Sequence, residues 1–143
     1  LEAALQAEPG CRQAAWNLAL LQEQAGDLRE AERLYEMLSA GEPAAEPAFR
    51  LGVLRMERGE FAAAAAAFEA AIAGRAGWPE ASLHLAVTNW KLGRSDAARN
   101  AFAAVLEGEP ENVEALFGLA VLALDGEDAA RAMELLRRMI ELG

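Results

Sequence analysis

Apolar residues of two sizes recur along this chain with a long and even period. Four alanines each stand four residues before a large side chain, and these pairs recur every 33 or 34 residues: Ala31 with Tyr35, Ala64 with Phe68, Ala98 with Phe102, and Ala132 with Leu136. A leucine followed by a small residue keeps the same period upstream, at Leu18-Ala19, Leu51-Gly52, Leu85-Ala86 and Leu119-Ala120. Because residues four apart lie on one face of an α-helix, both patterns predict amphipathic helices.

A short polar segment with glycine separates the two patterns in each unit. It is found at Gly26-Asp27, Gly59-Glu60, Gly93-Arg94 and Asp125-Gly126. Glycine adopts left-handed and helix-capping conformations at little cost, so a tight turn is predicted at each of these places. Each unit is therefore expected to be a helix, a turn and a second helix.

Proline and glycine mark the ends of the second helices. Pro9, Pro43 and Pro110 follow three of them, where proline blocks continuation of the helix and begins a connection. In the remaining unit Gly74 marks the end, and Pro79 opens the next helix at a first-turn position. The punctuation predicts one array with these segments: 1–11 (second helix and linker of a truncated repeat), then repeats at 12–44, 45–78, 79–112 and 113–143.

A helical hairpin of this length, with these small residues at these two sites, resembles the tetratricopeptide repeat. The resemblance covers nearly the whole chain. It implies an all-α fold, a right-handed α-solenoid of stacked antiparallel helix hairpins. Gly126 departs from the family pattern because it comes one residue early in the final turn. The tryptophan of the family's first helix is also replaced, by Ala15, Ala48, Ser82 and Leu116.

The small residues have a mechanical role in such a fold. Two antiparallel helices approach closely only where a side chain is nearly absent, and we expect Ala19 and Ala31 to form such a contact. The large residues of the repeat are expected to fill the space between successive hairpins. The first-helix leucines are expected to serve the core: Leu18, Leu51, Leu85 and Leu119.

The two ends of the chain interrupt the repeat. The same phase, followed backwards, places Leu1 at the position of Tyr35, so the chain is expected to begin within a hairpin. It stops at Gly143 after a second helix, without the polar capping helix that solenoids generally need. We therefore expect that this array was excised from a longer one, and a naturally short chain stays open as the alternative.

The family resemblance also implies where a partner binds, because the first helix of each hairpin lines the concave face of the superhelix. The repeat phase places apolar residues on that face in every hairpin. The candidate partner-binding residues are Trp16, Leu20, Phe49, Val53, Met56, Leu83, Val87, Trp90, Phe117 and Val121. Glutamates form an acidic border to this groove, at Glu46, Glu57, Glu80 and Glu114.

This groove favours a partner of particular chemistry. Family members that hold the C-terminal carboxylate of a chaperone use Lys and Asn on the concave rows, and that clamp is missing here. An apolar groove with an acidic border suits the apolar face of an amphipathic helix, or an extended hydrophobic peptide, with basic flanks. Two alternatives stay open: the stripe packs between neighbouring hairpins, or another part of the full-length protein fills it.

Charge narrows the classes of partner further. The 143 residues carry a formal net charge of -10 and no clustered basic patch, so neither nucleic acid nor an anionic membrane surface is expected to bind. No apolar stretch approaches the length of a membrane span, so direct membrane insertion is not expected. Alanine and arginine usage suggests a bacterial origin, and the compartment stays open between periplasm and cytoplasm.

The residues that commonly carry catalysis do not form a site in the sequence. The single histidine, His84, and the single cysteine, Cys11, have no partners at metal-ligand spacing. Phosphate-binding loops and nucleophile motifs are absent. We therefore expect no catalytic, metal or cofactor-binding residue. Trp78 is expected either to pack over a joint between hairpins or to lie on the surface.

The sequence thus predicts a protein–protein interaction scaffold rather than an enzyme. Similar alanine-rich arrays occur in bacterial envelope assemblies for pilus biogenesis and exopolysaccharide secretion, and the analogy places this chain among them. Two rival interpretations stay open. One is a non-catalytic, substrate-recruiting region of a larger transferase-type enzyme, and the other is a self-assembly module in which the hairpin faces at Leu1 and Met139 meet another copy.

Overall fold

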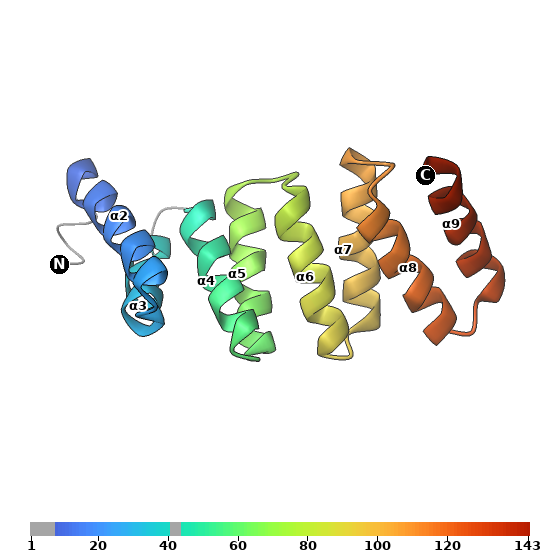
Figure 1. Ribbon diagram of the computed structural model, residues 1–143, viewed down its shortest axis with the longest axis horizontal. Coiled ribbons are helices and arrows are strands. Elements are labelled where there is room, and N and C mark those ends of the chain that lie inside the picture. The colour runs from blue at the N-terminus through green and yellow to red at the C-terminus, as the bar shows by residue number, and fades with distance from the viewer. Residues whose placement is uncertain (1–7, 41–43) are drawn as a thin grey trace. The chain divides into compact units, whose positions relative to one another are not determined.

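The computed structural model describes residues 8–40 and 44–143, and these residues form helices without any strand (Figure 1). The chain divides into two compact units, Leu1–Ala76 and Gly77–Gly143. The first unit contains α2 (Pro9–Ala25), α3 (Leu28–Ser39), α4 (Ala45–Glu57) and α5 (Phe61–Gly74). The second contains α6 (Pro79–Lys91), α7 (Ser95–Gly108), α8 (Val113–Asp125) and α9 (Ala129–Leu142). The predicted truncated helix before Glu8, with Leu1, and the predicted helix stop at Pro43 lie outside the described residues.

Helices α2 and α3 form the first hairpin of the first unit. Ala19 and Ala31, which were expected to let these helices approach, are both fully buried. The ring of Trp16 packs against the ring of Tyr35, with 5.7 Å between the centroids. The carboxylate of Asp27 caps α3 by accepting a hydrogen bond from the backbone N–H of Glu30.

Helices α4 and α5 approach each other at Gly52. A Cβ at this position would lie 2.7 Å from the Cε1 atom of Phe68, which is closer than packed carbon atoms come. The ring of Phe68 also packs against the ring of Phe49, with 5.8 Å between the centroids. The absence of a side chain after Leu51 therefore makes room for the large residue of the same hairpin.

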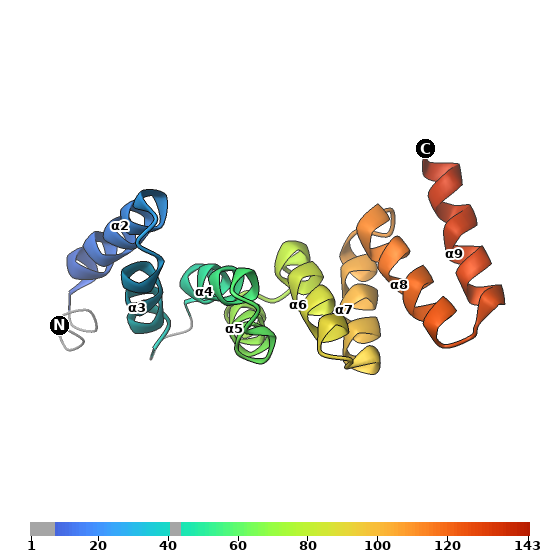
Figure 2. The same ribbon diagram turned by 60° about the horizontal axis from the view of Figure 1, so that its bottom comes forward.

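The second unit is built from two hairpins, α6 with α7 and α8 with α9, whose helices lie side by side in both ribbon views (Figure 2). Its core joins buried residues of all four helices, with Leu116, Leu122, Val105 and Leu135 among the most deeply buried. The ring of Phe102 on α7 reaches α8 of the next hairpin at Gly118. The expectation that large repeat residues fill the space between successive hairpins is confirmed for Phe102, whereas the ring of Phe68 packs on Phe49 and Gly52 of its own hairpin.

The turns follow the predicted glycines in three hairpins and depart from them in the fourth. Gly26, Gly59 and Gly93 have φ angles of 86°, 78° and 74°, in the left-handed region that glycine adopts without strain. In the last hairpin Gly126 has an ordinary φ of -86°, and Glu127 takes the left-handed conformation with a φ of 61°. The early glycine therefore leaves a residue with a side chain in the strained position.

Two sequence expectations about α2 are wrong. Pro9 does not begin a connection; it occupies the first turn of α2, where its missing N–H costs no hydrogen bond. The helix predicted to end at Pro9 lies outside the described residues. Leu18 is 43% exposed, whereas Leu51 and Leu119 are buried. Leu51 and Leu119 are buried because α4 packs against both α3 and α5, and α8 packs against both α7 and α9.

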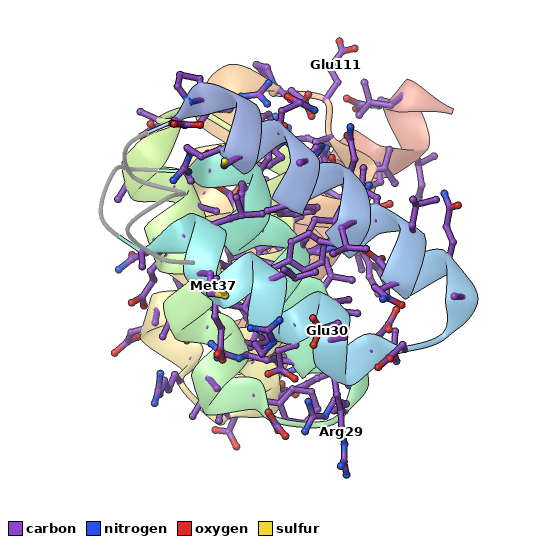
Figure 3. All side chains as sticks on the ribbon, turned by 90° about the vertical axis from the view of Figure 1, so that its left-hand side faces the viewer. Arg29, Glu30, Met37 and Glu111 are labelled. Atoms are coloured by element: carbon purple, nitrogen blue, oxygen red, sulfur yellow. The ribbon has the colours of Figure 1, made fainter. Side chains whose placement is uncertain are left out.

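The outward surface of α3 is charged (Figure 3). Arg29 extends away from the ribbon near the start of the helix, while Glu30 accepts hydrogen bonds from Nε and Nη2 of Arg33 at 2.9 and 2.5 Å. These bonds hold the pKa of the Glu30 carboxyl below its usual value. Arg33 also contacts the sulfur of Met37, at 3.4 Å. This face is therefore a solvated one.

Candidate protein-binding surface

The first unit has a pocket where α2, α3 and α4 meet. Its volume is about 460 Å³, and its walls include the indole of Trp16 and the carboxylate of Glu46, both of which the sequence assigned to the groove. Pro47 and Leu38 add apolar walls. Arg12 closes one side because its Nη2 donates to the carbonyl oxygen of Leu38 at 2.8 Å. An apolar side chain of a ligand fits such a pocket, with Glu46 beside it.

Farther along α2, a partly buried hydrogen bond fixes a carboxylate on the same helix face. Glu23 follows Trp16 and the partly buried Leu20 at helical spacing, and its Oε2 accepts a hydrogen bond from the hydroxyl of Tyr35 at 2.6 Å. Arg50 of α4 approaches the other oxygen of Glu23 at 3.4 Å. Burial and this hydrogen bond both raise the pKa of the Tyr35 phenol, so Tyr35 stays the donor.

Of the groove residues predicted on α4, Phe49 lies in the core. It is only 8% exposed, and its ring packs on Phe68. Val53 and Met56 are partly exposed, and Glu57 is exposed. The ligand-accessible part of α4 is therefore its second half, together with Glu46 at its start.

In the second unit, one face of α8 is apolar and open to solvent. Phe117 and Leu124 are each 55% exposed, and Val121 between them is partly buried. Val113 extends this row by one turn and is also exposed. We call these four residues the α8 stripe. The prediction included Phe117 and Val121. It did not include Val113, although its position four residues before Phe117 places it on the same helix face.

Helix α6 contributes a less exposed row. Leu83 and Val87 are partly buried and pack against the core of the unit, whereas Trp90 is 43% exposed. The sequence placed all three in the groove, and of these Trp90 offers the most surface.

The two glutamates predicted as the acidic border of this unit lie near its histidine, His84. Glu80 and Glu114, from α6 and α8, are exposed, and both act electrostatically on His84. Burial lowers the pKa of His84, and the two carboxylates oppose that shift. The negative potential of these two glutamates suits a positively charged group on a ligand.

Two other kinds of site, a metal site and a membrane-spanning helix, are not found among the described residues. Among them there is no group of three or more Cys, His, Asp or Glu side chains arranged to hold a metal ion. No helix in that part of the chain is both long and apolar enough to cross a bilayer. Trp78, at the N-cap of α6, is buried, so the alternative that it lies on the surface is wrong.

Comparison with known families agrees with the paired helices and their spacing. A tetratricopeptide repeat model matches residues 1–46 and 83–143, and a second model of the same description matches residues 55–107. The chain belongs to the tetratricopeptide repeat family. Tetratricopeptide repeat proteins generally act as non-catalytic scaffolds that bind proteins or peptides.

Solved structures show the same α-solenoid fold, as predicted. The chain is similar to MamA, with a TM-score of 0.85 and 19% identity over 98% of this chain and 82% of that one. It is similar to YrrB, described as a tetratricopeptide repeat protein with an unusual peptide-binding site, with a TM-score of 0.80 and 21% identity over 97% and 72% of the two chains. It is also similar to a tetratricopeptide repeat protein from Parabacteroides merdae, with a TM-score of 0.85 and 20% identity over 92% of this chain and 53% of that one.

One curated protein is similar in sequence. The CTR9 homolog of Arabidopsis thaliana is 33% identical over 107 residues, which cover 73% of this chain. The matched segment spans 10% of that protein's own length. The similarity is therefore to a small part of that protein.

Proposed function

We propose that this tetratricopeptide repeat chain is an interaction scaffold that binds a partner segment with an apolar face and basic flanks. The observation that carries the proposal is the α8 stripe, in which Phe117 and Leu124 each expose more than half of their surface. A helix of a stacked hairpin needs only one apolar face for its core, and α8 already buries Leu116, Leu119 and Leu122. The second apolar row is surface that a partner can cover.

Charge supports the basic flanks. Glu80 and Glu114 border the apolar rows of the second unit, and Glu46 lines the pocket beside Trp16 in the first. The chain as a whole carries a formal net charge of -10. An amphipathic helix or extended peptide with Lys or Arg beside its apolar residues would complement both features.

The proposal includes the wider setting predicted from sequence. We infer a non-catalytic role in a bacterial assembly, of the kind that serves envelope biogenesis or secretion. Alanine and arginine usage and the bacterial source of one structural neighbour, Parabacteroides merdae, support this setting. The peptide-binding site in the description of YrrB supports a peptide as the ligand.

A defined probe tests the binding proposal. A fluorescent amphipathic helical peptide of leucine and lysine should bind the chain, and the same peptide with glutamate replacing lysine should not bind the α8 stripe. The paired change Phe117→Ser and Leu124→Ser should weaken binding of the lysine peptide at least about tenfold, because it removes two exposed apolar anchors. Fluorescence anisotropy gives the affinity, and circular dichroism should show unchanged helix content and melting.

The matched control is Met133→Ser on α9, which removes another half-exposed apolar residue from the same unit. This variant should bind the lysine peptide as the parent does. Equal loss of affinity in the control and in the stripe variant would reject the α8 stripe as the binding surface. Glu80→Gln with Glu114→Gln should reduce the affinity and its dependence on salt, since both carboxylates attract the lysines.

A further inference from the structure

The second unit has a pocket that the α8 stripe does not use. It lies among α7, α8 and α9, and its volume is about 560 Å³. The α8 residues that line it include Leu119, Leu122 and Gly126. At about 100° per residue, these positions lie on the side of α8 opposite to the α8 stripe. The pocket is therefore a separate surface from the one proposed above.

The pocket combines an apolar floor with two cationic side chains. Leu119, Leu122 and Leu135 belong to the buried core of the unit and also line the pocket. Arg99 enters its wall from α7, and Arg131 enters from α9. Asp128 also lines the pocket, and its carboxylate caps α9 by accepting a hydrogen bond from the backbone N–H of Arg131 at 3.0 Å. The two guanidinium groups outnumber this one carboxylate in the lining and favour an anionic group there.

In the first unit, side chains of the protein fill the place that is equivalent to this pocket. Two repeats earlier in the sequence, the positions of Ala123 and Gly126 are Arg55 and Arg58 on α4. Arg55 Nη2 lies 2.5 Å from Glu36 of α3, and both arginines pair with Glu32 of the same helix. Guanidinium–carboxylate pairs therefore bridge neighbouring helices at this point of the first unit.

The second unit lacks both the arginines and the glutamates that form these pairs in the first unit. Small residues replace the two arginines of α4, which leaves open volume. On the other wall, Arg99 stands where α3 has Glu32, and Ala103 stands where α3 has Glu36. The positions that carry two carboxylates on α3 therefore carry one guanidinium group and one alanine on α7. A carboxylate from outside the unit would restore the pairing.

The present partners of the two arginines are replaceable. Arg99 pairs with Asp96 at 2.7 Å, and Arg131 pairs with Glu134 at 2.9 Å. Each pair lies within a single turn of one helix and is solvent-exposed, and such pairs stabilise a protein very little. Both guanidinium groups can therefore turn to a ligand at small cost.

We propose that this pocket binds a short extended segment of a partner protein in which Asp or Glu stands next to an aliphatic residue. The ligand carboxylate pairs with Arg99 and Arg131, and the aliphatic side chain covers Leu119 and Leu122. The site thus selects charge opposite to that selected by the α8 stripe. It makes the second unit a two-sided adaptor.

A substitution that restores the carboxylate of the first unit tests this site. Ala103→Glu places a carboxylate at the position of Glu36, and Ala103 is exposed, so folding should be retained. The probe is a short fluorescent peptide of alternating leucine and glutamate. Ala103→Glu should weaken its binding at least about tenfold, because an internal carboxylate then occupies the arginines. Ala104→Glu is the matched control, since it adds the same charge at the next exposed residue and should have little effect.

Further arms separate the possible outcomes. Arg99→Gln with Arg131→Gln should abolish binding of the acidic probe, whereas Arg137→Gln should not. Phe117→Ser with Leu124→Ser should leave the acidic probe bound, so failure of this site and failure of the α8 stripe are distinguishable. Equal binding by Ala103→Glu and Ala104→Glu, or no binding by the parent, would overturn the proposal. Self-association of the parent that Ala103→Glu abolishes would identify a second copy as the occupant and overturn it as well.

Discussion

The ring of Phe102 lies against the α-carbon of Gly118, one hairpin farther along the chain. A Cβ at Gly118 would come within 2.3 Å of the Cζ atom of that ring. The contact joins α7 to α8 at the centre of the second unit's core. Because Gly118 has no side chain, the ring of Phe102 can pack directly against α8, and this contact sets the distance between the two hairpins.

Gly118→Ala should therefore destabilise the chain by about 1–3 kcal/mol, because the ring must leave its position. The change would otherwise favour a helix interior, where alanine is better than glycine by about 1 kcal/mol. Urea unfolding measures the difference. Adding Phe102→Leu should recover part of the loss, and Gly108→Ala, which meets open space, is the control. A Gly118→Ala variant as stable as the parent would show that the ring yields freely.

The last turn should be improvable by exchanging its glycine. Glu127→Gly removes a side chain from a left-handed position and should stabilise the chain by about 1 kcal/mol. Gly126→Ala should add about 0.4–1 kcal/mol, since Gly126 has an ordinary φ and its Cβ meets only normal contacts. Thermal melting of both single variants and the double variant measures this. Destabilisation by Glu127→Gly would contradict the strain at this residue.

The hydrogen bond from Tyr35 to Glu23 should couple α3 to α2. Tyr35→Phe keeps the ring that packs on Trp16 and removes only the donor. A hydrogen bond to a charged group contributes about 1.5–3 kcal/mol, so a double-mutant cycle with Glu23→Gln should give a coupling of about 1 kcal/mol or more. Chemical denaturation supplies the four stabilities. Strict additivity would mean that the bond contributes nothing to folding.

His84 should titrate below the ordinary histidine value. It is the single histidine of the chain, so its imidazole signals in an NMR titration are unambiguous. Burial lowers its pKa below 6.5, and Glu80→Gln with Glu114→Gln should lower it further because both carboxylates raise it. A pKa above 6.5 in the parent would contradict this environment.

The same shift has a consequence for stability. Since the folded chain binds the proton more weakly than the unfolded chain, the contribution of His84 is fully present above the unfolded pKa and is lost as the pH falls from that value through the lower folded pKa. Between about pH 7.5 and about pH 5.5, His84→Gln should therefore lose less of its melting temperature than the parent. Equal losses in both proteins would show that burial of His84 does not depend on its charge.

Much of the candidate surface could be predicted because helical spacing fixes which residues share a face. Trp16 with Glu46, and Phe117 with Val121, follow from phase alone, and each pair lies on one unit of the structure. Phe49 shows where phase fails. It occupies the same repeat position as Phe117, yet it is buried because the ring of Phe68 on α5 packs on it. In the last hairpin the repeat position of Phe68 is held by Leu136 on α9, which has no ring, and Phe117 is 55% exposed.

The sequence by itself determined the helices, their turns and their pairing into hairpins, because period, glycine and proline act through local backbone geometry. Only the tertiary structure decided which of two equivalent side chains is buried, since burial depends on the neighbours that other helices supply. Leu51 is buried because α4 packs against both α3 and α5, whereas Leu18 at the same repeat position is 43% exposed. The pocket at Arg99 and Arg131 is a property of the same kind, because residues from three helices create it together.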